Sequence, residues 1–456
     1  MKTITNTKAK MNMKRINIIG AGLAGCEAAW QAAQRGIKVN LYEMKPRKYS
    51  PAHSSPLFAE LVCSNSFRSN QVSNAVGLLK EELHRCGSLI MTAAYESQVP
   101  AGSALAVDRD CFSQYVTDKI NNHPNITVIN EEITSVNETD DNVGDDVTII
   151  ATGPLTSDAL AEHIRDIIGC DYLHFYDAAA PIIDAASINM DTAFAASRYG
   201  KGEASYLNCP MTKEEYDIFY NELVNAEEAH LHDVDQKLTV FEGCMPVEVM
   251  AKRGYDTLRF GPLKPVGLPD PKTGEEYYAV IQLRLENTSA TAYNMVGFQT
   301  HLTFPEQKRV FRLIPGLENA EFFRYGVMHR NTFINSPQIL DNRYAMRSKP
   351  NVYFAGQITG VEGYIESTAS GFVAGLNAVN NILEKPAVIF PDVTVIGAMA
   401  AYISNPNIAN FQPMNANFGL VPLLDHKVKG GKAARQEAYA VRSLAVIDDI
   451  ARELDN

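Results

Sequence analysis

The clearest pattern of apolar and polar positions lies near the N-terminus. An apolar run at residues 16–19 stops at Gly20, an Ala-rich stretch with Glu and Gln covers Cys26–Arg35, and a second apolar run covers Lys38–Glu43. This order predicts a strand, a helix that ends at a glycine, and a second strand. A βαβ unit of this kind predicts a parallel sheet with helices packed on its faces.

Further along the chain, the periodicity predicts more elements of both kinds. We expect helices over Val76–Leu89, Phe112–Asn121 and Ser370–Asn380, strands over Ile126–Ile133, Val147–Ile150, Val280–Leu285, Val296–Leu302 and Val352–Ala355, and a helical, acidic stretch over Lys213–Glu242. Between Pro46 and Asn74 the periodicity is lost and Ser, Asn and Pro dominate, which is typical of a long functional loop.

A change of composition near residue 200 divides the chain. We expect a leader at 1–14, a nucleotide-binding domain at 15–199, an insert at 200–325, and the remainder of the first domain at 326–456. The predicted fold class is α/β: a Rossmann-like domain with a parallel sheet and helices on both faces, interrupted by an inserted α+β domain.

The overall charge bears on possible partners. The 456 residues carry a net charge of −12, which by itself argues against nucleic acid. Locally the balance reverses, because residues 301–350 contain eight Lys/Arg and four Asp/Glu, whereas residues 131–146 contain seven carboxylates and no basic residue. A nucleic-acid partner therefore stays open.

Cysteine usage and the N-terminus indicate the compartment. The seven cysteines contain no C-x-x-C pair, and residues 1–15 lack the apolar core of a secretory signal. We expect a reduced, cytoplasmic protein with no membrane span and no metal site.

The motif after the first strand predicts a dinucleotide site. It reads Gly20-Ala21-Gly22-Leu23-Ala24-Gly25, and Glu43 closes the second strand where it could accept a ribose hydroxyl. Two distant segments, Ile149–Gly153 with Thr152 and Val352–Gln357 with Gly356, resemble the second and third patches of two-domain flavoproteins and favour FAD. A second G-x-G-x-x-G is absent from the sequence, so we expect no separate NADPH-binding Rossmann domain.

Two cysteines lie in settings that suit an accessible thiol. Cys63 lies inside the long loop and Cys244 in a Gly- and Pro-flanked stretch, whereas Cys26, Cys86, Cys111 and Cys170 are expected in the core. From the residues alone, a buried inert thiol is the commoner case for any one of them.

Several long strings resemble one family. They include Phe58–Ser66, Asn74–Glu82, Ala104–Arg109, Phe241–Ala251, Asp256–Leu268, Val296–Leu302, Gly326–Pro337 and Phe354–Ser367. From Arg15 onward the chain is similar to the bacterial flavin- and folate-dependent tRNA (uracil-5-)-methyltransferases.

The resemblance implies formation of 5-methyluridine in the T-loop of tRNA (position 54). The one-carbon unit would come from 5,10-methylenetetrahydrofolate through reduced FAD, with electrons from NADPH or NADH. It implies Cys244 as nucleophile and Cys63 as proton-transfer partner, with the reverse assignment open. The implied contacts fall into three groups: with FAD, Gly20 to Gly25, Glu43, Asn65, Thr152, Gly153, Gly356, Gln357, Gly363 and Ser367; with folate, His301, Phe304 and Glu366; with RNA, Arg253, Arg259, Lys264, Arg309 and Arg330. Family members often carry Trp where this chain has Phe304.

Three other functions remain to be weighed. The same chemistry could act on 23S ribosomal RNA, and nothing in the sequence discriminates this substrate. A related flavoprotein of wobble-uridine modification has a longer C-terminal extension than this chain. The third alternative is a non-catalytic flavin-containing RNA-binding or regulatory protein.

Overall fold

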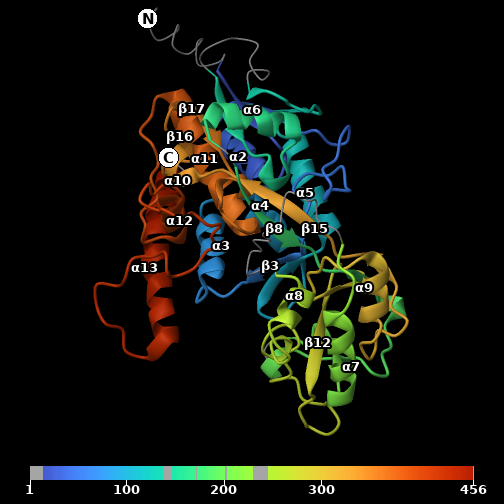
Figure 1. Cartoon of the computed structure of the whole chain (residues 1–456). Helices are drawn as coiled ribbons and strands as arrows, with labels where there is room; N and C mark the ends of the chain where they lie inside the picture. Colours follow the sequence, from blue (N-terminus) through green and yellow to red (C-terminus); the bar gives the residue numbers. More distant parts are fainter. Residues whose placement is uncertain (1–13, 137–145, 171, 201–202, 230–244, 455–456) are drawn as a thin grey trace, which may run out of the picture.

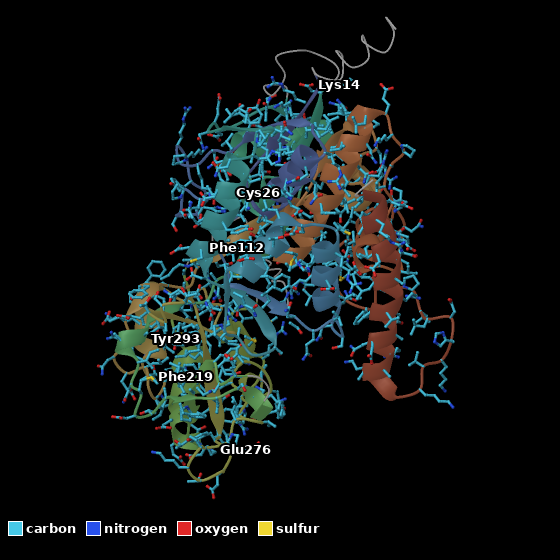
Figure 2. All side chains as sticks on the ribbon, turned by 180° about the vertical axis from the view of Figure 1, so that it is seen from behind. Lys14, Cys26, Phe112, Phe219, Glu276 and Tyr293 are labelled. Carbon is cyan, nitrogen blue, oxygen red and sulfur yellow. The ribbon has the colours of Figure 1, made fainter. Side chains whose placement is uncertain are left out.

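The computed structural model describes residues 14–136, 146–170, 172–200, 203–229 and 245–454 of the chain, and all structural statements refer to these residues. Two bodies are visible, one built on a parallel sheet and one on an antiparallel sheet (Figure 1). Each has its own hydrophobic core, with Phe112 in the first and Phe219 in the second (Figure 2). The expected leader, residues 1–14, lies outside the described residues except for Lys14.

The first body contains a six-stranded sheet in the order β16-β17-β7-β1-β2-β6. Its strands pair in parallel apart from the antiparallel β16–β17 pair. Their bounds are β1 Arg15–Ile19, β2 Lys38–Tyr42, β6 Ile126–Ile129, β7 Val147–Ile150, β16 Ala345–Met346 and β17 Lys349–Phe354. The chain leaves β1 for β2 on one side, while β7 lies on the other, and a crevice at such a reversal is where open α/β sheets bind ligands.

Most helices belong to the first body. They are α2 Leu23–Gln34, α3 Ala75–Arg85, α4 Leu89–Glu96, α5 Arg109–Asn121, α6 Asp158–Ile168, α10 Ser336–Ile339, α11 Tyr364–Leu383, α12 Val395–Ile403 and α13 Gly431–Leu454. Helices α2 and α11 pack closely because glycines face alanines: a Cβ on Gly371 would lie 2.2 Å from the Ala24 carbonyl oxygen. A small sheet, β3 Ser66–Ser69, β5 Ala104–Val107 and β4 Gln98–Val99, completes this body.

Two buried glutamates attach helices that are distant in sequence. Glu27 on α2 accepts hydrogen bonds from Ile90 N (3.0 Å) and Ser88 Oγ (2.7 Å) at the start of α4. Glu82 on α3 accepts from Val395 N (2.8 Å) and Ile396 N (2.9 Å) at the start of α12, and from Ser443 Oγ (2.5 Å) on α13. Burial raises the pKa of Glu82 to about 7.

The second body is an antiparallel sheet with helices, in the order β10-β11-β12-β13-β9-β14. Its strands are β9 Ile182–Asp184, β10 Phe194–Ala195, β11 Tyr206–Met211, β12 Ala279–Leu285, β13 Ala292–Met295 and β14 Phe322–Arg324, and its helices are α7 Lys213–Val224, α8 Val247–Lys252 and α9 Phe304–Phe311. The strands β8 Leu173–Ala178 and β15 Met328–Phe333 pair with each other where the chain passes between the bodies.

The predicted fold class, an α/β protein with a parallel sheet and a second α+β unit, is confirmed. The boundary expected at residue 200 falls too late for the second sheet, because β9 and β10 precede it. The strand predicted over Val296–Leu302 is wrong: β13 ends at Met295, Val296 and Gly297 form a turn, and only Leu302 makes an isolated bridge, with Glu228.

Two helix predictions also need correction. The single helix expected over Val76–Leu89 is two helices, α3 and α4, because Gly87 adopts a φ of +78° between them. The acidic stretch Lys213–Glu242 is helical only as far as Val224, and residues 230–242 lie outside the described part.

Of the cysteines expected in the core, Cys26 and Cys86 are buried, but Cys111 and Cys170 are exposed. For those two the prediction is wrong, because both lie at helix ends that face solvent.

Candidate active site

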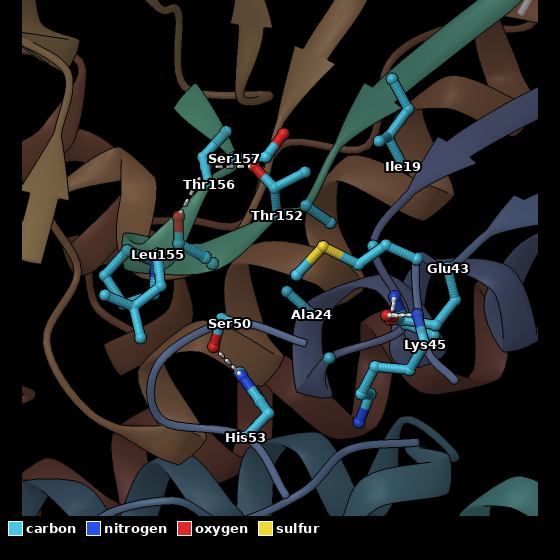
Figure 3. Close-up of a pocket in the computed structure, with 18 of the residues that line it drawn as sticks. Ile19, Ala24, Glu43, Lys45, Ser50, His53, Thr152, Leu155, Thr156 and Ser157 are labelled. Atoms are coloured by element: carbon cyan, nitrogen blue, oxygen red, sulfur yellow. Dashed lines mark hydrogen bonds between the residues drawn. The ribbon is translucent and has the colours of Figure 1, made fainter. Parts of the chain in front are cut away.

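A pocket opens at the carboxyl ends of β1, β2 and β7 (Figure 3). It contains about 1150 Å³ of free space, a figure that includes the solvent in its mouth. Most of the proposed FAD residues line it together: Gly20, Ala21, Gly22, Leu23, Ala24, Glu43, Thr152, Gly153, Gly356, Gln357 and Ser367. The structure thus joins three segments that are more than 100 residues apart.

The start of α2 is built to receive an anion. Its N-cap, Gly22, supplies no side-chain hydrogen bond, and the first turn contains no acidic residue. Free N–H groups and the helix dipole therefore point into the pocket. A Cβ on Gly22 would meet no protein atom within 4 Å, whereas a Cβ on Gly25 would lie 1.8 Å from the Gly20 carbonyl oxygen. Gly22 leaves room for a ligand, and Gly25 leaves room for the helix to approach the strand.

Glu43 is held in place at the end of β2. Its Oε2 accepts a hydrogen bond from Ala21 N (2.9 Å) and its Oε1 from Lys45 N (3.0 Å). The carboxylate thus braces the glycine-rich turn while it lines the pocket, as expected for a residue that meets a ribose.

Several pocket residues could not be picked out from the sequence. Lys45, Ser50, His53 and Tyr364 line the pocket, and Ser50 Oγ lies 2.5 Å from His53 Nδ1 (Figure 3). Burial lowers the pKa of His53, so the neutral imidazole is favoured. All of these except Tyr364 fall in or beside the loop that has no periodicity.

Three predicted FAD residues do not line the pocket: Gly25, Asn65 and Gly363. Asn65 is fully buried, and its Nδ2 donates to the carbonyls of Val107 (3.0 Å) and Leu285 (2.9 Å). Gly363 has a φ of +121°, and a Cβ there would lie 2.2 Å from Glu366 Oε2. Asn65 and Gly363 therefore contact protein atoms and do not form the pocket surface.

The loop that carries Cys63, residues 61–65, borders the pocket and is held by arginines from both bodies. Arg109, at the start of α5, donates to the carbonyl of Leu61. It also pairs with Glu286, which follows β12 in the second body. Arg324, on β14, donates to the carbonyl of Val62. The second body therefore helps to fix the backbone before the thiol.

The backbone after the thiol is fixed in the same manner. Arg284, on β12, donates from Nε to Asn65 Oδ1 (2.9 Å) and from Nη2 to Ser64 Oγ (2.7 Å). The Tyr364 hydroxyl accepts from Cys63 N (2.9 Å) and Ser64 N (3.0 Å). Burial, followed by the nearby Cys63, raises the pKa of Tyr364, so the hydroxyl stays protonated. Cys63 remains partly exposed beside the pocket.

His301 lies between two carboxylates of the second body. Its Nε2 lies 2.8 Å from Glu228 Oε2, and its Nδ1 lies 2.7 Å from Glu248 Oε1, although not in line for a hydrogen bond. Burial alone would lower the pKa of His301, but Glu248 and Glu228 outweigh it and raise the pKa. The imidazolium is therefore favoured.

The proposed nucleophile, Cys244, lies outside the described residues. The described residues on each side of 230–244 are both held near His301: Ala229 N donates to the His301 carbonyl (2.8 Å), and Val247 N donates to the Gln299 carbonyl (2.7 Å). Residues 299–301, which receive these bonds, are also close to Cys63. Thr300 N donates to Ala179 O (3.4 Å), and Cys63 Sγ lies 3.9 Å from the neighbouring Ala178 O.

The other two predicted folate residues lie on different bodies. Phe304 is 51 % exposed and stacks on Tyr325 with ring centroids 4.9 Å apart. Glu366 is fully buried in the first turn of α11 and pairs with Arg68, while its Oε2 has no hydrogen-bond partner.

The predicted RNA-contacting residues differ in the ion pairs that they form. Arg309 pairs with Glu306 and Glu222, and Arg259 pairs with Asp256. No ion pair is recorded for Lys264 among the described residues. The remaining two are Arg253, which is exposed, and Arg330, which lies on β15.

The chain was compared with known proteins. The family model described as "Glucose inhibited division protein A" (GidA) matches residues 15–386. A relative from Acetivibrio thermocellus, named methylenetetrahydrofolate–tRNA-(uracil-5-)-methyltransferase TrmFO, is 62 % identical over 95 % of this chain and 98 % of its own. This chain belongs to the TrmFO family. The TrmFO relative from Halalkalibacterium halodurans is 58 % identical over 97 % of this chain and all of its own.

A solved structure supports the fold that TrmFO relatives imply. The structure of Aquifex aeolicus GidA matches with a TM-score of 0.69 at 16 % identity and covers 97 % of this chain and 74 % of that one. At this identity the match establishes the fold alone. As in a TrmFO-family flavoprotein, the pocket residues fit FAD. The N-terminus of α2 is open to an anion, Glu43 is fixed by hydrogen bonds where a ribose would lie, and Gly22 has no side chain that would keep a ligand from the backbone.

Among the described residues, no helix is long and apolar enough to cross a membrane. In the same part of the chain, no three His, Cys, Asp or Glu side chains group as metal ligands would.

Proposed function

We propose that this chain forms 5-methyluridine in the T-loop of tRNA, at position 54, with 5,10-methylenetetrahydrofolate as one-carbon donor. The observation that carries the proposal is the joining of a FAD-shaped pocket to the Cys63 loop: Tyr364 lines the pocket and holds the backbone at Cys63. The names of the near full-length relatives support the substrate and the donor. A cytoplasmic location and the use of NADPH or NADH are part of the proposal.

Bound FAD would supply transfer of the one-carbon unit and of the electrons from NAD(P)H. In this chain the N-terminus of α2 would hold its pyrophosphate, Glu43 its ribose, and the segments at Thr152 and Gly356 the rest of the molecule. Tyr364 and Ser367, from the start of α11, close the wall nearest Cys63.

The two thiols have different roles in the reaction of the uracil ring. Uracil C5 is a weak nucleophile, and addition of the Cys244 thiolate to C6 pushes an electron pair onto C5, which then attacks the one-carbon unit. A base must next take the C5 proton while the bond between the methylene and its carrier breaks, which leaves an exocyclic methylene on C5. A hydride, supplied by the electrons of NAD(P)H, completes the methyl group, and the thiolate leaves C6 as the ring double bond reforms. We assign the proton to Cys63, because its loop is fixed at the pocket and its thiol is partly exposed.

The folate would lie between the two bodies. We assign His301, Phe304 and Glu366 as its neighbours. The unpartnered Oε2 of Glu366 is a free acceptor for a pterin N–H.

The RNA would be held by Arg253, Arg259, Lys264, Arg309 and Arg330. Because the charges of Arg259 and Arg309 are shared with carboxylates, we expect Lys264 to contribute more to phosphate binding than either of them. Arg253→Ala with Lys264→Ala should weaken tRNA binding and reduce its salt dependence by about two phosphate contacts. Unchanged affinity and salt slope would remove this assignment.

The decisive experiment is turnover on an unmodified tRNA transcript. We expect methylation with methylenetetrahydrofolate and NADPH, and none with S-adenosylmethionine. Loss of 5-methyluridine from ribosomal RNA but not from tRNA in a deletion strain would show that ribosomal RNA is the substrate instead. A yellow protein that is inert to both donors would leave only a regulatory flavoprotein.

The roles of the two thiols are tested separately. Cys244→Ala should form no covalent adduct with RNA that contains 5-fluorouridine, whereas Cys63→Ala should form the adduct and fail to release product. Adduct formation by Cys244→Ala but not by Cys63→Ala would exchange the two assignments.

A further inference from the structure

One side chain of the second body is displayed to solvent to an unusual degree. Phe260 is 84 % exposed, and no large hydrophobic side chain in the described part of the chain is more exposed. A single exposed apolar residue needs no explanation. Phe260 differs from such a residue because its turn is held rigidly and basic side chains lie beside it.

The Phe260 turn, residues 256–263, cannot fold its ring back into the core. Phe260 N donates to Asp256 O (3.2 Å), and Leu263 N donates to Leu258 O (2.9 Å). Leu258 and Leu263 are fully buried beneath the turn and occupy the core positions that the ring would need. The ring is therefore held outward by the buried side chains below it.

The turn is also anchored to the sheet beneath it. Val280 N, on β12, donates to Leu263 O (3.1 Å), and Pro262 lies against Gly297, where a Cβ would come within 2.6 Å. A fixed ring loses little conformational freedom when another ring stacks on it, so stacking gains are not cancelled by ordering costs.

The surroundings of the turn are basic in an acidic protein. Residues 252–264 contain four Lys/Arg and one Asp, whereas the chain has a net charge of −12. Two of the four are paired, Lys252 with Glu228 and Arg259 with Asp256. Arg259 lies over the Tyr278 ring, with Cζ 3.7 Å from the centroid, so its guanidinium plane is also ordered. No acidic partner of Lys264 is recorded in the described part of the chain. Cations around an exposed aromatic ring suit RNA, which offers phosphates and base faces together.

The charge also argues against a second copy of this chain on the same surface. In a symmetric dimer the same patch would face itself, which would bring like charges together. A polyanion meets no such repulsion.

Strand β12 links this turn to the active site. It receives the turn at Val280 and carries Arg284, which donates to Ser64 beside Cys63. At about 3.3 Å per residue, these two points are about 13 Å apart along the strand. An RNA loop whose target base enters the pocket can therefore reach the turn with neighbouring nucleotides.

We propose that Phe260 is a base-stacking residue: its ring receives a nucleobase of the substrate RNA outside the active site, while the adjacent cations contact phosphate. The inference deepens the RNA recognition of the proposed function and rests on it. Stacking holds the RNA in register and adds affinity without reading a particular base.

The first test compares Phe260→Ala, Phe260→Tyr and Phe260→Trp in the FAD-loaded protein. Phe260→Ala loses one aromatic stacking partner, so its Kd for a tRNA transcript should rise about tenfold. Phe260→Tyr and Phe260→Trp keep an aromatic ring and should bind as the wild type does. The salt slope should stay unchanged in all three, because no phosphate contact is lost. Phe323→Ala, which removes a 61 % exposed ring from β14, is the matched control and should bind as wild type.

Two outcomes of that test would overturn the proposal. Wild-type affinity of Phe260→Ala would show that no base stacks there. Equal weakening by Phe323→Ala would show a general loss of apolar surface. If the wild-type protein bound no RNA at all, the proposed function would fail instead, which distinguishes the two.

The second test reads the contact directly. Trp30 is the single tryptophan of the chain, so Phe260→Trp in a Trp30→Phe background carries one reporter. A T-arm stem-loop RNA should quench its fluorescence with the same Kd as anisotropy gives. Binding without quenching would refute stacking at this position.

Discussion

Two glycines of the cofactor turn should both lose FAD binding when a methyl group is added, but only one of the two variants should also lose stability. Gly25→Ala places a Cβ 1.8 Å from the Gly20 carbonyl oxygen, and contacts under 3.0 Å are essentially never seen. Helix α2 must therefore retreat from β1 by about 1.2 Å. Gly22→Ala places its Cβ in open space within the pocket lining, and the φ of −75° at that position suits alanine.

The expected magnitudes follow from those contacts. Overpacking of this kind costs about 1–3 kcal/mol, so Gly25→Ala should lower the Tm of the FAD-free protein by several degrees. A shift of about 1 Å in the anion-binding turn should also abolish stable FAD binding. Gly22→Ala should keep the Tm of the FAD-free protein and still lose FAD affinity at least tenfold, because its methyl group occupies ligand space.

The assay separates folding from cofactor binding. Thermal unfolding of FAD-free protein measures the first, and titration of FAD against its own fluorescence measures the second. The reasoning would be refuted if both variants lost Tm equally, or if Gly22→Ala bound FAD as wild type does.

Three further predictions concern other parts of the molecule. Tyr364→Phe removes the oxygen that accepts from Cys63 N and Ser64 N, which should destabilise the Cys63 loop by about 1–3 kcal/mol. Turnover should therefore fall while the FAD content stays unchanged, and amide hydrogen exchange at Cys63 should accelerate. Glu82→Ala uncaps α12 and frees α13, so a loss of about 2–4 kcal/mol and faster proteolysis between these helices are expected; a wild-type Tm and proteolysis rate would contradict it. The ion pair of His301 with Glu248 raises the histidine pKa, so its stabilisation is complete below about pH 6.5 and lost as pH rises through the folded pKa. The Tm difference between wild type and Glu248→Gln should therefore shrink from pH 6 to pH 9, and a constant difference would count against the pair.

The elements that the sequence predicted well are those whose signals are local. The β1–α2–β2 unit follows from an apolar run, a glycine-rich turn and a helix that ends at a glycine, all within residues 15–42. The strand expected over Val296–Leu302 shows the limit of such signals. Phe298 and Leu302 are buried, but Thr300 N bonds to the distant carbonyl of Ala179 instead of to a neighbouring strand, so burial does not require a strand.

The candidate site shows the same division. Its glycine-rich motif is local and was recognisable, and most of the residues proposed for FAD line one pocket. The contacts that hold Cys63 are long-range: Tyr364 is 301 positions away, and Arg284 meets Asn65 across 219 positions. A tyrosine or an arginine alone carries no periodicity that would reveal such a partner.

The arrangement of the loop at residues 61–65 limits how far the protein can be recombined. Arg109 belongs to the first body, whereas Arg284 and Arg324 belong to the second, and all of them bond to those five residues. A chimaera that takes its second body from a remote homologue would bring arginines placed for another loop, and the guanidinium groups at the positions of Arg284, which is buried, and Arg324, which is half-buried, would then lose their acceptors in this loop. Exchange of substrate-recognition regions between such enzymes should therefore succeed only when residues 61–65 travel with the second body, although the two are far apart in the gene.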